Sequence, residues 1–225
     1  MTRDSANRRP LTPEAMGEYW DQYFSAKGMP WGSEPSDSAI DACARFLRQD
    51  FKNILVPGVG YGRNAKVFTE RGMNVTGIEV SAKAAELARQ YLGNGPVIHV
   101  GSVTDMPFDD AAYDGIYCYA LIHLLDGPAR RRFIASCHEQ LRAGGEMIFV
   151  ALSKRSPMFG NGRLLEKDRW LMDNGLPVFF YDRDSALSEF HGYGTIEIDD
   201  LEEPIKFMDG AAPLHCIRIR CDKEQ

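Results

Sequence analysis

The residues best suited to chemistry begin with a glycine-rich turn at Gly58, Gly60 and Gly62. The apolar run at 54–56 predicts a buried strand before this turn, and a helix is expected to begin after it. Alternate glycines let the backbone turn tightly and leave room for a ligand, toward which the following helix points its first N–H groups. Glu79 ends the next predicted strand, twenty-one residues after Gly58, and its carboxylate suits a ribose diol. This spacing predicts a nucleoside-binding α/β domain.

The elements that must position these residues alternate between strand and helix. Strands are predicted over residues 53–56, 74–79, 97–100, 115–119 and 146–151. Helices are predicted over residues 64–71, 81–91, 128–142 and 184–190, with two more beginning at Thr12 and near Ser36. The strictly alternating runs 195–198 and 214–220 predict a closing antiparallel pair. The alternation predicts a parallel sheet with helices on both faces.

The domain organisation is predicted from where the alternation of strands and helices is present and where it is lost. Residues 1–10 are polar and basic and are expected to form a disordered tail. Residues 11–50 form a predicted N-terminal helical segment, and residues 51–225 form the main domain. Within that domain residues 153–181 lose the alternation and combine glycine, proline and bulky aromatic residues. Such an insertion is typical of a substrate lid, although a packed structural excursion explains it nearly as well.

Composition excludes several classes of protein. A net charge of −6 argues against a nucleic-acid partner, and the three successive arginines at 130–132 are expected to form a solvated helix face. No apolar run approaches 18 residues and no signal-peptide core is present, which disfavours membrane spanning and secretion. The five cysteines lack CxxC spacing, so we predict no metal site and a reducing, cytoplasmic setting. Four of them fall in apolar elements and are predicted to be core thiols: Cys43, Cys118, Cys137 and Cys216.

Several later motifs resemble those of class I S-adenosylmethionine-dependent methyltransferases. Residues 101–108 resemble the adenine-side turn, residues 113–119 the fourth strand, and residues 141–145 the turn before the fifth strand. The closing strand pair is similar to the reversed last strand of that class. The resemblance implies a doubly wound, mostly parallel, seven-stranded Rossmann-like sheet with a reversed terminal strand, and S-adenosyl-L-methionine as cofactor.

A narrower resemblance is to the tellurite-resistance and thiopurine methyltransferase group. It rests on residues 60–64 and 72–75 and on the aromatic segments 20–24 and 30–35. In that group the N-terminal aromatic segment folds over cofactor and substrate, so residues 11–50 are expected to cap the cofactor site. Two positions depart from the wider class: Pro57 stands where an acid is usual before the first glycine, and Ser102 replaces a common adenine-binding Asp.

The resemblance implies a role in cofactor binding for a defined set of residues. The glycine turn would hold the methionine part with Arg63 near its carboxylate, Glu79 would accept from both ribose hydroxyls, and Ser102 would meet the adenine amino group. The whole set is Trp31, Gly58, Val59, Gly60, Arg63, Asn64, Glu79, Val80, Ser102, Val103, Tyr119 and Ala120. Tyr119 and Ala120 are expected to line the methyl-transfer pocket at the end of the fourth strand.

The expected reaction is in-line methyl transfer to a small-molecule acceptor. A soft nucleophile such as a thiol, a thiopurine or a reduced chalcogen needs no general base, and the sequence offers only His123 as a candidate base. A packed histidine explains that residue more simply. Two alternatives stay open, a non-catalytic S-adenosylmethionine-binding module and an NAD-dependent oxidoreductase. The sequence predicts neither the acceptor nor the oligomeric state; Arg155, Arg163, Lys167, Arg169 and Tyr181 would suit an anionic acceptor or surface solvation equally.

Overall fold

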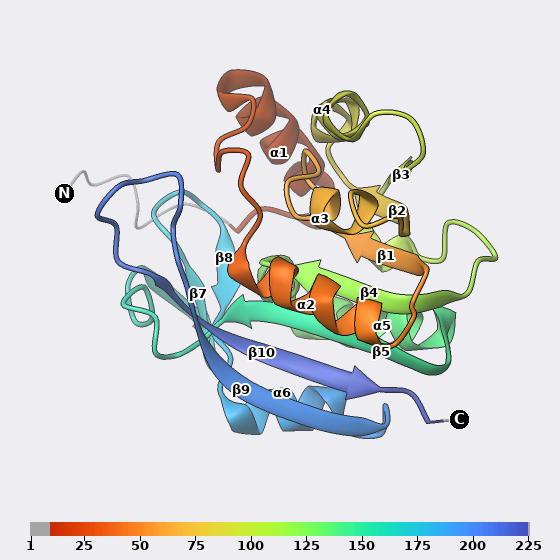
Figure 1. The fold of residues 1–225 in the computed structure, drawn as a ribbon. Coiled ribbons are helices and arrows are strands. Elements are labelled where there is room, and N and C mark those ends of the chain that lie inside the picture. The colour runs from red at the N-terminus through yellow and green to blue at the C-terminus, as the bar shows by residue number, and fades with distance from the viewer. Residues whose placement is uncertain (1–9, 225) are drawn as a thin grey trace.

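A seven-stranded sheet forms the centre of the protein (Figure 1). The computed structural model describes residues 10–224, so the tail predicted for residues 1–10 lies almost wholly outside the described residues. The strand order is β3-β2-β1-β4-β5-β10-β9. The strands are β1 (Asn53–Pro57), β2 (Asn74–Glu79), β3 (Val97–Val100), β4 (Tyr113–Tyr119), β5 (Leu141–Leu152), β9 (Thr195–Glu203) and β10 (Leu214–Asp222). The first five are parallel, and β10 runs antiparallel between β5 and β9, as the sequence predicts.

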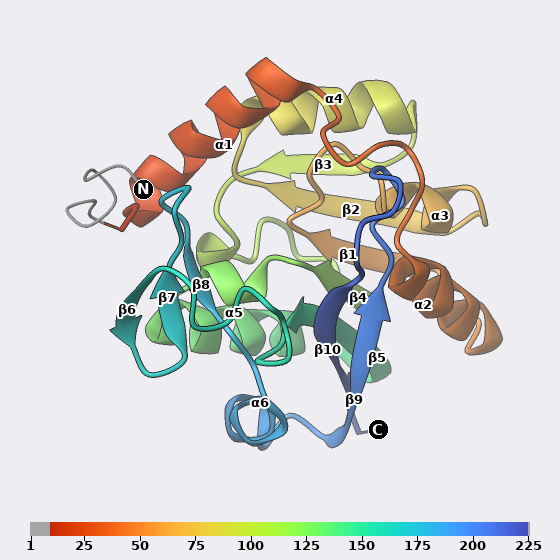
Figure 2. The ribbon, with the colours of Figure 1, turned by 90° about the vertical axis from the view of Figure 1, so that its left-hand side faces the viewer.

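Helices cover both faces of this sheet (Figure 2). They are α1 (Pro13–Lys27), α2 (Asp37–Arg48), α3 (Ala65–Thr69), α4 (Ala82–Leu92), α5 (Gly127–Gln140) and α6 (Arg183–Phe190), with short 3₁₀ turns η2 (Val103–Asp105) and η3 (Ile122–Leu124). Ser36, Ser81 and Asp126 cap the starts of α2, α4 and α5 by accepting backbone N–H bonds. Helix α3 is shorter than the predicted span 64–71, because the glycine turn extends through residue 64 and a second turn begins at residue 70.

The core divides into two layers because successive strand residues face opposite sides of the sheet. In β5, Met147 and Phe149 pack with α5 and α6 residues, whereas Ile148 and Val150 pack with α2 and α3 residues. Both faces are therefore apolar, which explains the continuous apolar strands in the sequence.

Residues 153–181, the predicted insertion, contain regular secondary structure. They contain a second, three-stranded antiparallel sheet made of β6 (Arg163–Glu166), β7 (Arg169–Leu171) and β8 (Pro177–Phe179). Val178 and Phe180 are buried in a cluster with Leu11, Met16 and Trp20 of the N-terminal segment. This segment and the insertion, far apart in the sequence, therefore pack side by side.

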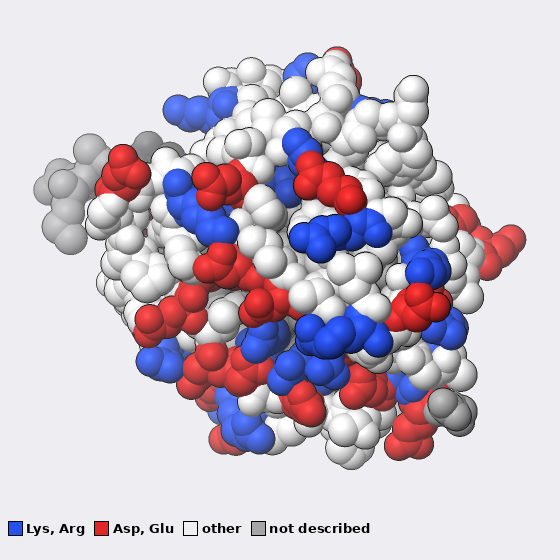
Figure 3. Space-filling model, viewed as in Figure 1, with Lys and Arg blue, Asp and Glu red and all other residues white. Residues whose placement is uncertain are grey.

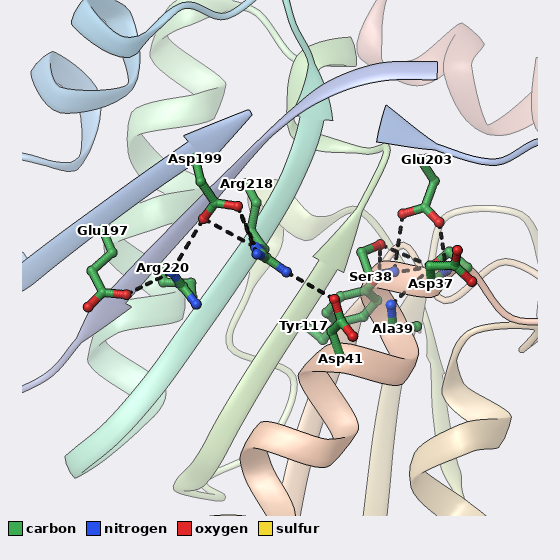
Figure 4. Close-up of polar contacts among 11 residues, drawn as sticks. Asp37, Ser38, Ala39, Asp41, Tyr117, Glu197, Asp199, Glu203, Arg218 and Arg220 are labelled. Atoms are coloured by element: carbon green, nitrogen blue, oxygen red, sulfur yellow. Dashed lines mark hydrogen bonds and ion pairs between the residues drawn. The ribbon is translucent and has the colours of Figure 1, made fainter. Parts of the chain in front are cut away.

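The start of α2 is joined to the end of β9 (Figure 4). The buried carboxylate of Glu203 accepts hydrogen bonds from the backbone N–H groups of Asp37, at 2.6 Å, and Ser38, at 3.2 Å. A carboxylate at a helix N-terminus is stabilised by the helix dipole. Lys206, in the β9–β10 loop, forms an ion pair with Asp37 at 2.6 Å. These contacts hold the β9–β10 loop beside the α1–α2 connection.

Further ion pairs join β10 to β9 and to α2. Arg218 pairs with Asp199 of β9 at 2.7 Å and with Asp41 of α2 at 3.4 Å, and Arg220 pairs with Asp199 and Glu197 (Figure 4). Figure 3 shows charges of both signs interspersed over this face. Such a face presents no single-sign field to a polyanion.

The prediction that residues 130–132 form a solvated helix face is wrong for Arg130. Arg131 and Arg132 are exposed, but Arg130 is buried and its guanidinium pairs with Glu189 of α6 at 2.7 Å. All five cysteines are free and buried. No helix within residues 10–224 is long and apolar enough to cross a membrane, and no cluster of three or more metal-binding side chains occurs in that range.

Candidate active site

A cavity of about 440 Å³ opens at the carboxyl ends of β1, β2 and β4. The chain leaves β1 on one side for β2 and β3 and returns on the other as β4, so this is the switch point at which open α/β sheets bind ligands. All twelve residues assigned to the cofactor from the sequence line this cavity. Tertiary structure thus brings together residues from position 31 to position 120.

The glycine turn forms one wall of the cavity. Gly58 and Gly60 have φ values of +66° and +57°, a region that costs other residues about 1–2 kcal/mol. A Cβ atom on Gly58 would lie 2.9 Å from Cδ2 of Leu121, whereas one on Gly60 would meet nothing closer than 4.0 Å. Gly58 is therefore required both for its conformation and for close packing, and Gly60 for its conformation alone.

Glu79 fixes this turn to the end of β2. Its Oε2 accepts from the N–H of Gly60 at 2.8 Å, and its Oε1 accepts from the N–H of Ser81 at 2.9 Å. The residue is only 6% exposed, and burial raises the pKa of Glu79 while these backbone donors act in the opposite direction. Each carboxylate oxygen has a second acceptor position, so the group can also receive two ligand hydroxyls.

Aromatic side chains from the N-terminal segment close the cavity over this turn. The ring of Trp31 stacks on Tyr61 at 6.0 Å, and Trp20 and Phe24 pack against Trp31 at 6.3 and 5.6 Å. The hydroxyl of Tyr61 donates to the carbonyl of Gly32 at 2.7 Å. Tyr61 is a lining residue that the sequence reasoning did not single out, although its place between two turn glycines was a signal for it.

Ser102 and Val103 lie where β3 leads into η2. The hydroxyl of Ser102 accepts from the N–H of Thr104 at 3.2 Å and shares a hydrogen bond with its hydroxyl at 2.8 Å. Thr104 also lines the cavity. Two hydroxyls, those of Ser102 and Thr104, therefore lie where the sequence predicted one.

Arg63 spans the turn and the N-terminal segment. One of its Nη atoms donates to the carbonyl of Glu34 at 3.0 Å, and its guanidinium carbon lies 5.7 Å from the ring centroid of Tyr119. Burial raises the pKa of Tyr119. Arg63 places a positive charge in the wall near the glycine turn, which suits an anionic ligand group.

His123 is not among the cavity residues. It is buried, and its Nδ1 accepts from the backbone N–H of Leu152 at 3.3 Å. Burial lowers the pKa of His123 to about 4. This environment favours a packing role and gives no support to the candidate general base.

A pH test follows from this burial. Between about pH 6.5 and pH 4 the unfolded chain gains a proton at His123 that the folded chain does not take up, so stability falls as the pH falls. This contribution is about 3 kcal/mol over the window. His123→Asn retains an acceptor for the Leu152 N–H and is expected to lose this part of the pH dependence in denaturant unfolding at pH 4.5 and 7.0. An unchanged pH dependence, or loss of turnover in folded His123→Asn, would contradict the packing role.

The structure adds lining residues beyond the twelve assigned to the cofactor. Asp126 comes from the start of α5, and Ile205 and Phe207 come from the β9–β10 loop. Arg169 of β7 also lines the cavity, the only one of the five candidates for an anionic acceptor to do so among the described residues. No glycine motif or spacing marks these positions in the sequence. An apolar Phe207–Met208 pair within a glycine- and proline-containing loop was the only available signal for that loop.

Comparison with known proteins agrees with this geometry. Residues 55–149 match the family described as a methyltransferase domain. The chain is 29% identical to O-methyltransferase resE of Aspergillus sclerotiorum over 143 residues, covering 60% of this chain and 52% of that protein. It is 28% identical to O-methyltransferase cnsE of Penicillium expansum over 162 residues, covering 69% and 56%. The chain spans about half the length of these curated relatives.

Solved structures share the whole fold. The 1,6-didemethyltoxoflavin-N1-methyltransferase of Burkholderia thailandensis superposes with a TM-score of 0.68 at 18% identity, covering 100% of this chain and 99% of that one. A structure from work on the conversion of a disulfide bond into a thioacetal group during echinomycin biosynthesis gives 0.71 at 20% identity, covering 93% and 92%. Together with the strand order, these findings define a Rossmann-like class I methyltransferase fold.

Proposed function

We propose that the protein is an S-adenosylmethionine-dependent methyltransferase that acts on a small-molecule acceptor. The observation that carries this proposal is the position of Glu79, a buried carboxylate that shares one cavity with the glycine turn at the switch point of the sheet. The methyltransferase-domain match over residues 55–149 supports it.

The lining residues fit S-adenosylmethionine in kind and in position. Gly58 and Gly60 present backbone without side chains, and Glu79 has acceptor capacity for the two ribose hydroxyls. Ser102 and Val103 would meet the adenine, and Arg63 would meet the methionine carboxylate. The acid that is usual at position 57 is absent here, because that residue is Pro57. In this assignment Arg63 would instead bind the other end of the methionine part, its carboxylate.

The bound cofactor would supply a methyl group on a sulfonium sulfur, which is a good leaving group. The acceptor atom would bond to the methyl carbon as the carbon–sulfur bond breaks, with S-adenosylhomocysteine as the leaving group. The protein residues hold the two partners in line and exclude water, which supplies most of what such a transfer needs. Trp20, Phe24 and Trp31 provide the apolar cover, and Tyr119 and Ala120 form the wall at the end of β4.

We assign a soft nucleophile, a thiol first, as the acceptor. No His, Lys or Cys is found among the described residues that line the cavity, and both lining acids already accept backbone hydrogen bonds. A nucleophile that ionises near neutral pH needs no base from the protein. The named relatives above favour oxygen as the second candidate acceptor atom. Membership of the tellurite-resistance and thiopurine group, and a cytoplasmic location, remain predictions.

The direct test is a screen with methyl-labelled S-adenosylmethionine, read by product mass. We expect the purified protein to methylate aromatic thiols at pH 7 faster than the matching phenols, because more of the thiol is ionised. Faster methylation of phenols would indicate that the acceptor atom is oxygen and not sulfur. Tight binding of S-adenosylmethionine without turnover of thiols, thiopurines, reduced chalcogens, phenols or amines would favour the binding-module alternative, and nicotinamide-dependent turnover would favour the oxidoreductase.

A further inference from the structure

The part of the cavity beyond the proposed cofactor residues is mostly apolar. Met16 of α1, Leu124 of η3, Pro177 of β8 and Phe207 of the β9–β10 loop contribute to it. Apolar walls of this kind accept a flat or bulky hydrocarbon body. We call this region the acceptor pocket.

Arg169 brings a positive charge into this apolar pocket. It lies on β7, paired with Phe179 of β8, and it lines the cavity. Its Nε is buried and has no hydrogen-bond partner within residues 10–224. A buried N–H without a partner is costly in a folded protein and is usually satisfied by a ligand, a water or an ion.

The one ion pair that the described residues give Arg169 does not involve this edge of the guanidinium. Nη1 pairs with Glu166 at 3.2 Å, and the side chain of Glu166 is 55% exposed. Exposed pairs of this type contribute little and do not fix the cation strongly. The Nε–Nη2 edge carries two parallel N–H donors, the arrangement that binds a planar carboxylate through two hydrogen bonds.

The acids of the cavity do not provide that carboxylate. Glu79 is engaged by the N–H groups of Gly60 and Ser81, and Asp126 accepts from the N–H of Ala129 as the cap of α5. The other cationic or phenolic candidates raised by the sequence do not line the cavity: Arg155, Arg163, Lys167 and Tyr181.

We infer that the acceptor is a mainly apolar, aromatic molecule that carries a carboxylate, and that the Nε–Nη2 edge of Arg169 binds this carboxylate. The carboxylate fixes the orientation of the ring, so that the nucleophilic atom faces Tyr119 and Ala120 at the end of β4. Arg169 is thus a specificity-determining residue. This inference rests on the proposed function for the reaction, but the carboxylate site itself does not depend on turnover.

The test uses matched ligands and matched variants of the full chain. Benzoate binding is measured by calorimetry with and without S-adenosylhomocysteine, and methylation is measured for 4-mercaptobenzoate, 4-mercaptobenzamide and thiophenol. The variants are Arg169→Gln, Arg169→Lys and Lys167→Gln, the last being an exposed cation of the same hairpin that lies outside the cavity. Thermal melting checks that each variant is folded.

We expect Arg169→Gln to weaken benzoate binding at least tenfold and to raise KM for 4-mercaptobenzoate at least tenfold. KM for thiophenol and for 4-mercaptobenzamide should stay within about twofold. Arg169→Lys should recover part of the binding because it keeps the charge without the planar pair of donors, and Lys167→Gln should match the wild type.

Two outcomes would overturn the inference. One is equal use of 4-mercaptobenzoate and thiophenol by the wild type, and the other is benzoate binding that is absent or unaffected by Arg169→Gln. A protein that binds benzoate through Arg169 but binds no S-adenosyl compound would instead refute the proposed function and leave the carboxylate site standing.

Discussion

Glu79→Ala is expected to weaken binding of S-adenosylhomocysteine by at least about a hundredfold. The carboxylate would accept two ribose hydroxyls, and hydrogen bonds to a charged group contribute about 1.5–3 kcal/mol each. The substitution also removes the acceptor for the N–H groups of Gly60 and Ser81, which hold the glycine turn against β2. Isothermal titration of the purified variant measures the change directly.

Two controls separate loss of the ligand contact from loss of the fold. Glu79→Gln keeps the shape and one acceptor oxygen, so it should melt near the wild-type temperature and still bind at least tenfold more weakly. Glu70→Ala removes an exposed acid at the end of α3 and should bind like the wild type. Wild-type affinity in a folded Glu79→Ala protein would refute the assignment of this carboxylate to the ribose.

Arg130→Ala is expected to lower the free energy of unfolding by about 3–5 kcal/mol, the typical cost of removing one partner from a buried ion pair. The guanidinium pairs with Glu189, donates to the carbonyl of Leu125 at 3.0 Å, and lies 3.8 Å from the ring centroid of Phe179. It therefore joins α5, α6 and β8. Its removal leaves the largely buried carboxylate of Glu189, which is 12% exposed, with the hydroxyl of Tyr181 as its remaining side-chain donor in the described structure. Urea unfolding followed by circular dichroism measures the loss.

The neighbouring arginines supply the matched control. Arg131→Ala and Arg132→Ala remove the same charge from exposed positions of α5, so each should change stability by no more than about 0.5 kcal/mol. Adding Glu189→Gln to an Arg130→Met background should recover part of the loss, because it removes the unpaired charge. Equal effects at all three arginines would show that the buried pair has no special part in stability.

Individual strands and helix starts could be predicted from the sequence because the patterns that mark them involve only neighbouring residues. The strands β2 and β3 have the predicted limits, and the caps at Thr12, Ser36 and Ser81 mark helix starts as expected. A hydroxyl that accepts a backbone N–H two or three residues later acts within one turn, so neighbouring residues suffice to predict it. Arg130 shows the limit of such local prediction. Three arginines follow one another at 130–132, and only contacts with distant segments make the first of them buried.

The acceptor side of the cavity could not be predicted in the same way. Residues 153–181 form β6, β7 and β8, and Val178 and Phe180 in this region bury their side chains against the N-terminal segment. Short strands with weak patterns depend on such distant partners, and a sequence pattern does not identify the partner.

Patterns among neighbouring residues were enough to predict the framework of the candidate cofactor site: the glycine turn, the acid that ends the second strand, and the alternation that places both at one edge of a parallel sheet. These depend on backbone conformation and on side-chain period, which adjacent residues encode. The folded chain was needed to show that Arg169 and Phe207 join that edge, that Arg130 is buried, and that His123 lies outside the cavity lining. Those outcomes depend on desolvation and packing between segments that are not neighbours in sequence, such as Arg130 with Glu189, 59 residues apart, and His123 with Leu152, 29 residues apart.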